Sequence, residues 1–572
     1  MSESPSAPGG KGPFTVIRRV GSYPAAVLDV LGVVVRNEPL RRIEAAFALF
    51  NSAEWATWVA MIVFAYGKGG ATEAGVVAAV QLAPSALLAP VAASLGGRHP
   101  PGRALLAAYI VQALACGIGG IALMSDLPKD AVYALLIPAS VSFTLTRPLH
   151  SSFAPALARS PEELTATNVA SGWIVGISVF VAPALAGVLL GVSSSGVVFL
   201  VMGCACAVGA VVVAPLRDLV GAAEPDEVEA HTSLAEGFRA VGQDRTARLL
   251  VALLAAQGIL IGSLDIMYVE LSQGVLGRGG SWAGYLNAAF GLGGVLAILV
   301  TARLVGRARM GPPLAVAVGV AAAALLGIAF VPGAAGIVLM LVVVGGSLST
   351  FDVAARTLLQ RAAPTDLLAR VFGLVEGLEA ATIAAGALLA GVLITIGGAT
   401  LGAVGLAIVL PAVAVLSGKR LLEIDRHADV PVVEIGLLRS MSLFASLPPP
   451  TLEMLARALK RLEIPAGTVV IRQGDPGDLF YVIADGEAEV ERDGTRVAVL
   501  SRGDGFGELA LLLDRPRNAT VRARTDARLY TLSPDEFIPA VTGHPRAAAV
   551  GAEFVRTRLE PDEPLARRDM RP

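Results

Sequence analysis

The chain has 572 residues, of which 54% are hydrophobic and only 16% are charged, and its mean hydropathy is +0.67. Soluble globular proteins carry about a quarter charged residues, so this composition excludes an ordinary soluble protein and predicts one embedded in a lipid bilayer. The formal net charge of −2 argues against a nucleic-acid-binding surface, because such surfaces are strongly basic.

Residues 1–42 are expected to stay in the cytosol. Residues 1–13 are small and polar, without the basic start and cleavable apolar core of a signal peptide. The apolar run at 25–35 is too short to cross a bilayer, which takes about 20 residues. We therefore expect this N-terminal segment to contain an amphipathic helix on the cytoplasmic membrane surface.

Long apolar runs begin at residue 43, and twelve of them are long enough to span a membrane. An even number returns the chain to its starting side, and arginine is concentrated in every second connection, which the positive-inside rule places in the cytoplasm. The sequence thus predicts a multi-pass protein of the cell (inner) membrane with both termini in the cytosol. The runs are 43–66, 73–95, 103–124, 131–149, 168–190, 194–216, 247–271, 281–304, 312–331, 334–357, 370–395 and 399–417.

An internal repeat divides these runs into two sets of six. The dipeptide Gly-Arg at 97–98 recurs at 306–307, and the tetrapeptide Ala-Gly-Val-Leu at 186–189 recurs at 390–393, with nearly equal offsets. Each copy occupies the same place in its own set. The predicted fold is therefore an all-α membrane bundle of two six-helix halves in the same orientation. The halves are 43–216 and 247–418, joined by a cytoplasmic linker at 217–246.

This parallel repeat resembles the major facilitator superfamily. Arg147-Pro148 and the segment from Glu163 to Asn168 further resemble the branch of bacterial drug and siderophore exporters related to the enterobactin exporter. The resemblance implies a secondary transporter that exports an unidentified small molecule, with protons as the coupling ion.

In this superfamily the first, fourth, seventh and tenth spans line the central cavity. Ionisable groups inside a membrane are costly, so each one in these spans is a candidate for function. The candidates for the transport cavity and for proton coupling are Asn51, Glu54, Trp58, Arg147, Asp265, Asp352 and Arg356.

Glu54 is the strongest of these candidates because it lies near the middle of the first span. Asn51 and Trp58 are one turn away on roughly the same helical face. A carboxylate in such a place suits proton coupling, since burial changes the balance between its charged and neutral forms. An equally weighted alternative is a structural ion pair with an arginine of the opposite half.

Other charged residues have simpler interpretations. Arg147, His150 and Arg356 lie near the cytoplasmic ends of their spans, where charges commonly anchor the topology or form a gate. No Ser-His-Asp order, HExxH motif, P-loop or paired CxxC motif occurs, so we expect no enzyme, no metal and no cofactor. Without an ATP-binding motif, transport would draw on an ion gradient.

A soluble domain is expected after the last span, beginning at residue 441 with a helix at 450–459. Its strands would be followed by helices at 534–541 and 545–558, with Phe554 as a candidate to stack on a bound base. The expected parts are a linker at 419–440, the domain at 441–560 and a tail at 561–572.

The stretch 503–523, GDGFGELALLLDRPRNATVRA, is suited to binding an anionic sugar phosphate. The amides of Gly507, Leu509 and Ala510 would point from a helix start toward an anion. Arg517 adds a permanently charged planar group for phosphate oxygens. Glu508 would be repelled by phosphate, so its natural partner is a sugar hydroxyl.

This stretch resembles the phosphate-binding cassette of the cyclic-nucleotide-binding domain, as in the catabolite activator protein and protein kinase A regulatory subunits. Residues 470–490 are similar to paired strands of that family's β-roll, with turns at Gly474 and Gly486. The resemblance implies a regulatory ligand, cyclic AMP or cyclic GMP. It also assigns Glu508 to the ribose 2′-hydroxyl, Arg517 to the cyclic phosphate, and backbone amides near Leu509, Ala510 and Ala519 to its other oxygens.

Asn518, directly after the cassette arginine, is neither the alanine common in cyclic AMP binders nor the threonine common in cyclic GMP binders. The base preference therefore stays open, and cyclic AMP is favoured on family frequency. Taken together, the residues predict a proton-coupled efflux transporter regulated by a cytosolic cyclic-nucleotide domain. The alternative is a membrane-tethered cyclic-nucleotide receptor that no longer transports and signals to a partner.

Overall fold

The computed structural model describes most of the chain between residues 32 and 542, in two compact units. The helical unit ends at Asp425 and the C-terminal unit begins at Arg426. The expected helix at 545–558 with Phe554, the tail, the repeated Gly-Arg dipeptides and most of 217–246 lie outside the described residues. The described ranges are 32–95, 100–159, 161–219, 239, 241–242, 245–301, 304, 309–331, 333–362, 365–427, 432–445, 447, 449–513 and 515–542.

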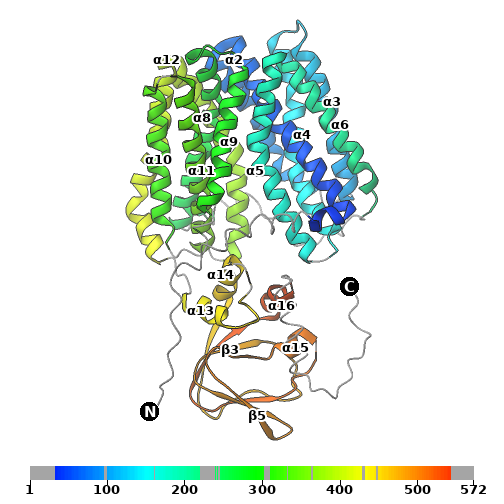
Figure 1. Cartoon of the computed structure of the whole chain (residues 1–572), viewed down its shortest axis with the longest axis vertical. Helices are drawn as coiled ribbons and strands as arrows, with labels where there is room; N and C mark the ends of the chain where they lie inside the picture. Colours follow the sequence, from blue (N-terminus) through cyan, green and yellow to red (C-terminus); the bar gives the residue numbers. More distant parts are fainter. Residues whose placement is uncertain are drawn as a thin grey trace, which may run out of the picture. The chain divides into compact units, whose positions relative to one another are not determined.

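The helical unit is a bundle of long apolar helices that stand side by side (Figure 1). Within the described residues, ten helices are long and apolar enough to cross a membrane. The first half contains α2 (Glu38–Leu95), α3 (Pro101–Leu123), α4 (Lys129–Leu157), α5 (Pro161–Val192) and α6 (Ser195–Val213). The second half contains α8 (Arg245–Glu270), α9 (Ser281–Thr301), α10 (Gly311–Phe330), α11 (Ala334–Ala362) and α12 (Thr365–His427).

Two of these helices each contain two of the expected runs. The 58 residues of α2 would extend about 87 Å if straight, far beyond the roughly 30 Å hydrocarbon core of a bilayer. The helix is interrupted at Gly69 and Gly70, and Gly70 has a φ of 71°, which favours glycine. The 63 residues of α12 are interrupted in the same way at Gly397 and Gly398, and Gly398 has a φ of 66°.

The two halves approach closely where small residues meet backbone. A Cβ atom at Gly187 of α5 would lie 2.8 Å from the carbonyl oxygen of Ser281 on α9. A Cβ at Gly391 of α12 would lie 2.9 Å from the carbonyl oxygen of Ala71 on α2. Both glycines belong to the repeated Ala-Gly-Val-Leu tetrapeptide, so the repeat marks two helix crossings between the halves.

The C-terminal unit contains two four-stranded antiparallel sheets, as a β-roll requires. The strand orders are β1-β8-β3-β6 and β2-β7-β4-β5. The turns expected at Gly474 and Gly486 have φ of 90° and 89°. The strands are β1 (Lys460–Ile464), β2 (Val469–Ile471), β3 (Phe480–Asp485), β4 (Ala488–Arg492), β5 (Thr495–Leu500), β6 (Gly505–Phe506), β7 (Thr520–Ala523) and β8 (Ala527–Leu532).

Helices complete the core of this unit. The expected helices appear as α14 (Pro449–Ala458) and α16 (Pro534–Thr542), and α15 (Glu508–Leu513) follows β6. The segment expected to be a linker, 419–440, is largely helical. The helix α12 continues to His427, and α13 (Val432–Ser440) packs Leu437 and Leu438 into the same core. Apolar side chains at helical spacing explain why this segment folds.

Candidate functional site

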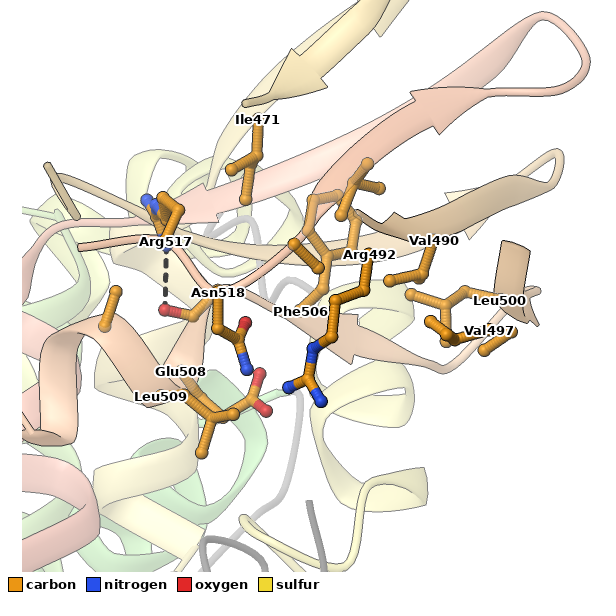
Figure 2. Close-up of a pocket in the computed structure, with 15 residues that line it drawn as sticks. Ile471, Val490, Arg492, Val497, Leu500, Phe506, Glu508, Leu509, Arg517 and Asn518 are labelled. Carbon is orange, nitrogen blue, oxygen red and sulfur yellow. Dashed lines mark hydrogen bonds between the residues drawn. The ribbon is translucent and has the colours of Figure 1, made fainter. Parts of the chain in front are cut away.

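A cavity of about 340 Å³ opens in the C-terminal unit between β2, β4, β5, β7 and α15 (Figure 2). All seven residues of the predicted nucleotide site line this cavity, which brings them together although they come from different elements. One wall is apolar and the other carries the polar groups. The lining residues are Ile471, Val490, Arg492, Val497, Ala498, Leu500, Phe506, Gly507, Glu508, Leu509, Ala510, Arg517, Asn518, Ala519 and Val521.

Arg517 is anchored in the cavity wall, with only 3% of its side chain exposed. Its Nη1 atom donates to the carbonyl oxygen of Gly507 at 2.8 Å, and Nη2 donates to the carbonyl oxygen of Leu479 at 2.7 Å. Nη2 also pairs with the exposed carboxylate of Asp478 at 3.1 Å. These contacts hold the guanidinium in one orientation before any ligand arrives.

Gly507 is required by this arrangement. Its φ is 91°, a backbone conformation that L side chains rarely adopt. A Cβ atom there would also lie 2.5 Å from Nη1 of Arg517. The glycine lets the chain turn from β6 into α15 while the arginine passes beside it.

Tyr481 supports the arginine with its aromatic ring. The ring stacks on Phe506 with 5.0 Å between centroids, and Cζ of Arg517 lies 6.0 Å from the Tyr481 centroid. Burial and the negative charge of Asp478 raise the pKa of the Tyr481 hydroxyl. The tyrosine therefore stays neutral at physiological pH and contributes an aromatic surface next to the guanidinium.

Glu508 opens α15 and is 2% exposed, so its carboxylate is one of the few charged groups buried in this unit. Leu509 and Ala510, also in the first turn of α15, line the same cavity. A carboxylate oxygen can accept more than one hydrogen bond, so a ligand hydroxyl in the cavity could donate to Glu508.

Arg492 is a cavity residue that was not predicted. It ends β4, and Figure 2 shows its side chain extending toward Glu508. Strand alternation could have indicated it, because residues 488, 490 and 492 share one face of β4 and Ala488 is buried. The cassette motif does not extend to this neighbouring strand.

A second cavity, of about 600 Å³, lies between the halves of the helical unit. Residues of α2, α5, α8, α9, α11 and α12 line it, and most are apolar or glycine. Of the predicted transport residues, Asp352 and Arg356 line this cavity and form an i,i+4 ion pair with N–O distances of 3.0 and 3.1 Å. Its other polar lining residues are Gln257, Ser349, Glu379 and Thr382.

Glu54 forms an ion pair away from that lining. Its Oε2 atom lies 2.6 Å from Nη2 of Arg147, which also donates to Oδ1 of Asn51 at 3.2 Å. The alternative expectation was an arginine of the opposite half, whereas Arg147 belongs to α4 of the same half. The first and fourth spans are neighbours within a half, which sequence separation alone did not reveal.

Trp58 and Asp265 connect the two halves. The indole Nε1 of Trp58 donates to Oδ2 of Asp265 at 2.9 Å, and Asp265 is 9% exposed. Further along the same two helices, α2 and α8, the hydroxyl of Tyr66 donates to the carboxylate of Glu270. The predicted transport residues thus form three separate groups: a pair in the cavity, a cluster in the first half and a bond across the interface.

Glu44 and His150 form a further buried pair in the first half, with 3.1 Å between Oε1 and Nε2. Glu44 was not predicted, because it stands at the very start of the first apolar run. His150 was expected to be an anchor or a gate at a span end, and the structure buries its side chain within the first half.

Comparisons with known proteins match both units. Residues 45–387 match the family described as Major Facilitator Superfamily, and residues 461–543 match the family described as Cyclic nucleotide-binding domain. The predicted fusion of these two families is thereby confirmed.

Two curated relatives each match about a hundred residues of the chain. The cAMP-dependent protein kinase regulatory subunit of Emericella nidulans is 46% identical over 104 residues, which are 18% of this chain and 25% of that protein. The corresponding subunit of Schizosaccharomyces pombe is 46% identical over 103 residues, with the same coverage. The chain therefore spans about a quarter of the length of these relatives.

Two solved structures are similar to about a fifth of the chain. The regulatory domain of Toxoplasma gondii PKA with cAMP is 36% identical and covers 20% of this chain and 44% of that one, with a TM-score of 0.19. The Thermus thermophilus catabolite activator protein is 28% identical and covers 21% of this chain and 58% of that one, with a TM-score of 0.19.

Proposed function

The chain belongs to the Major Facilitator Superfamily, and we propose that it is a proton-coupled exporter of a small molecule, regulated by a cyclic nucleotide that binds its C-terminal domain. The observation that carries the proposal is the meeting of a buried arginine and a buried glutamate around one cavity in a domain fused to a transporter. The regulatory ligand would be made in the cytosol, so both termini belong on that side.

The chemistry of the cavity supports a cyclic nucleotide as the ligand. Arg517 is oriented for a phosphate, Glu508 can accept from a ribose hydroxyl, and the apolar wall suits a purine. Cyclic AMP is the favoured ligand, because the matched relatives are cAMP-dependent protein kinase regulatory subunits. Cyclic GMP is the second candidate.

We further propose that the ten long helices cross the membrane twelve times, with the double glycines of α2 and α12 at the membrane surface. The hydroxyls of Thr72 and Thr395, next to these interruptions, are 2.7 Å apart. This contact holds the two halves together at the end of the bundle where the double glycines lie. The cavity is lined by residues of α12 that precede this contact, at 375–382. With the arginine-rich connections inside, this conformation is open toward the cytosol.

The cavity lining also narrows the class of substrate. Its surface is mainly apolar, and among its charged residues Asp352 and Glu379 outnumber Arg356. An amphipathic molecule that is neutral or carries one positive charge fits this lining best. Ethidium is a suitable probe of that chemistry.

Proton coupling is assigned to carboxylates that can exchange their partners. When Glu54 binds a proton, Arg147 loses its ionic partner and is released to the substrate path. Asp265 would respond to the opening of the interface, because its bond to Trp58 exists only while the halves are closed at that point. Each carboxylate thus links proton binding to a change of contacts.

Regulation would pass through the last membrane helix. The helix α12 ends at His427 and α13, part of the C-terminal core, begins at Val432. A short connection transmits a movement better than a long flexible linker does. Coupling free energies of this kind are typically about 1 to 3 kcal/mol, or roughly 5- to 150-fold in an equilibrium constant.

The test is ethidium transport in proteoliposomes with an imposed pH gradient, with and without cyclic AMP. We expect the full chain to respond to the nucleotide by a factor in that range. A chain truncated after His427 should transport without responding. Transport that never responds in the full chain would remove the regulatory role, and equal responses of both chains would place the effect elsewhere.

The receptor alternative predicts a different pattern in the same assay. A non-transporting receptor binds cyclic AMP with normal affinity but moves no ethidium under any gradient. The ion pair and polar residues in the 600 Å³ cavity favour transport, because a receptor has no need to bury them there.

A further inference from the structure

A buried acid and base meet where α2, α4 and α5 pack together. Oε1 of Glu44 lies 3.1 Å from Nε2 of His150 and accepts from Oγ of Ser171 at 2.8 Å. The two side chains of the pair are only 6% and 5% exposed. The imidazole also stacks on the ring of Phe47, with 3.9 Å between centroids, so its orientation is fixed.

The surroundings supply little compensation for a negative charge on Glu44. Its second oxygen, Oε2, is buried and accepts no hydrogen bond from the described residues. Arg147 is one turn from His150 on α4, but its guanidinium is bonded to Glu54 and Asn51. On the neighbouring helices, Ser171 of α5 and Tyr109 of α3 face the pair. Cys206 of α6 lies near Tyr109.

This arrangement favours one proton held between Glu44 and His150. A buried carboxylate without a cation is costly by several kcal/mol, whereas a carboxylate beside a protonated imidazole is neutral as a pair. Histidine is the side chain that can supply or remove that charge near neutral pH. The oxygen without a partner, Oε2, is the atom at which a second proton could bind.

From this geometry we infer that Glu44 and His150 form a proton-binding site of the first half, separate from the Glu54 and Arg147 pair. Its role in coupling rests on the proposed transport function, but its binding of a proton does not. When α2, α4 and α5 rearrange to admit water, the pair can release its proton, and when they close it takes one up.

The position of the pair along α2 supports this role. Glu44, Asn51 and Trp58 are seven residues apart, so they share one face of the helix. Asn51 contacts the Glu54 and Arg147 cluster, and Trp58 contacts Asp265 across the interface. The buried pair, the Glu54 cluster and the bond that closes the two halves thus lie along one face of α2.

Magic-angle-spinning NMR of the full chain in lipid, labelled with ¹⁵N-histidine, tests the inference directly. The chain has five histidines, so few signals appear, and His150→Gln identifies the relevant one. The His150 nitrogen signals are followed between about pH 5 and pH 9, and the inference requires them to change within that range. In Glu44→Gln the proton affinity of His150 should change by at least about tenfold, because its charged partner is gone.

Glu73→Gln is the matched control, since this carboxylate of the same half pairs with Lys129 instead. It should leave the His150 titration unchanged, and the helical circular dichroism of each variant reports whether it is folded. A His150 signal that does not change over this pH range overturns the inference, and that result needs no variant. An unchanged titration in Glu44→Gln overturns the pairing.

Ethidium transport separates this inference from the proposed function. In Glu44→Gln we expect transport driven by a pH gradient to fall at least tenfold while downhill exchange of ethidium persists. Undiminished gradient-driven transport would remove the pair from coupling. If the wild type moves no ethidium at all, the proposed transport fails, while the NMR result on proton binding still stands.

Discussion

The nucleotide cavity and the interior of the helical unit use charged residues in different ways. In the C-terminal domain, Arg517 is held by two backbone carbonyls and one carboxylate, and it lines a cavity whose other polar groups lie mostly between residues 507 and 519. In the helical unit, Arg147 is held by Glu54 and Asn51 from another helix, far away in the sequence.

The difference shows how each site can change state. The backbone carbonyls that hold Arg517 have fixed positions in the domain, so the arginine is already ordered before a ligand binds. Side chains on separate helices can exchange partners when those helices move, so the membrane groups are suited to a cycle of conformations. Four substitutions test this contrast, beginning with the largest expected effect.

The replacement Arg517→Ala should weaken cyclic AMP binding to the full chain by about 100-fold. The charged hydrogen bonds to the phosphate are worth about 1.5 to 3 kcal/mol each, and none can be replaced from nearby. Calorimetry in nanodiscs measures the effect. Arg515→Ala, an exposed arginine two residues away, should change affinity little. Equal affinity in wild type and Arg517→Ala would refute the assigned site.

Glu508→Gln should weaken cyclic AMP binding by roughly 10- to 30-fold, because the buried carboxylate loses its charge but keeps its shape. The loss should be specific to the ribose hydroxyl. Wild type should therefore bind 2′-deoxy cyclic AMP as weakly as the variant binds cyclic AMP. If the deoxy ligand loses a further tenfold in the variant, Glu508 does not contact that hydroxyl.

Trp58→Phe should open the interface between the halves by removing the indole donor to Asp265. Leaving a buried carboxylate without this bond costs about 1 to 3 kcal/mol, or roughly 5- to 150-fold in the closing equilibrium. Thr395→Cys, placed at the cross-half contact, reports opening by its labelling rate with an impermeant maleimide. Trp173→Phe on α5 is the control, and similar rates in both variants would contradict the assigned contact.

Arg492→Val should have the smallest effect and should change selectivity more than affinity. An arginine donates well to the O6 and N7 acceptors of guanine, whereas adenine presents an amino donor at the equivalent position. We expect cyclic GMP to lose about three- to tenfold relative to cyclic AMP in competition assays, corresponding to about 1 kcal/mol. Parallel losses for both nucleotides would show that Arg492 does not read the base.

Sequence reasoning succeeded where a feature depends on neighbours along the chain. The apolar runs express a local rule of length, because each run must be long enough to cross a bilayer. The cassette from Gly507 to Ala519 is equally local, because a turn, a helix start and one arginine form its polar side. The two families could therefore be predicted from the amino-acid sequence alone.

Contacts between distant segments could not be predicted in this way. Nothing in the sequence pairs Glu44 with His150, or Trp58 with Asp265, because these residues meet only after helices pack. Arg492 is an intermediate case. Strand alternation puts it on the same face as Val490, but the pairing of β4 with β5 and β7 decides that this face lines the cavity. Helical and strand periodicity determine on which face of its own element a side chain lies. Only tertiary packing decides which face of a neighbouring element that side chain contacts, because the packing depends on how all the elements fit together.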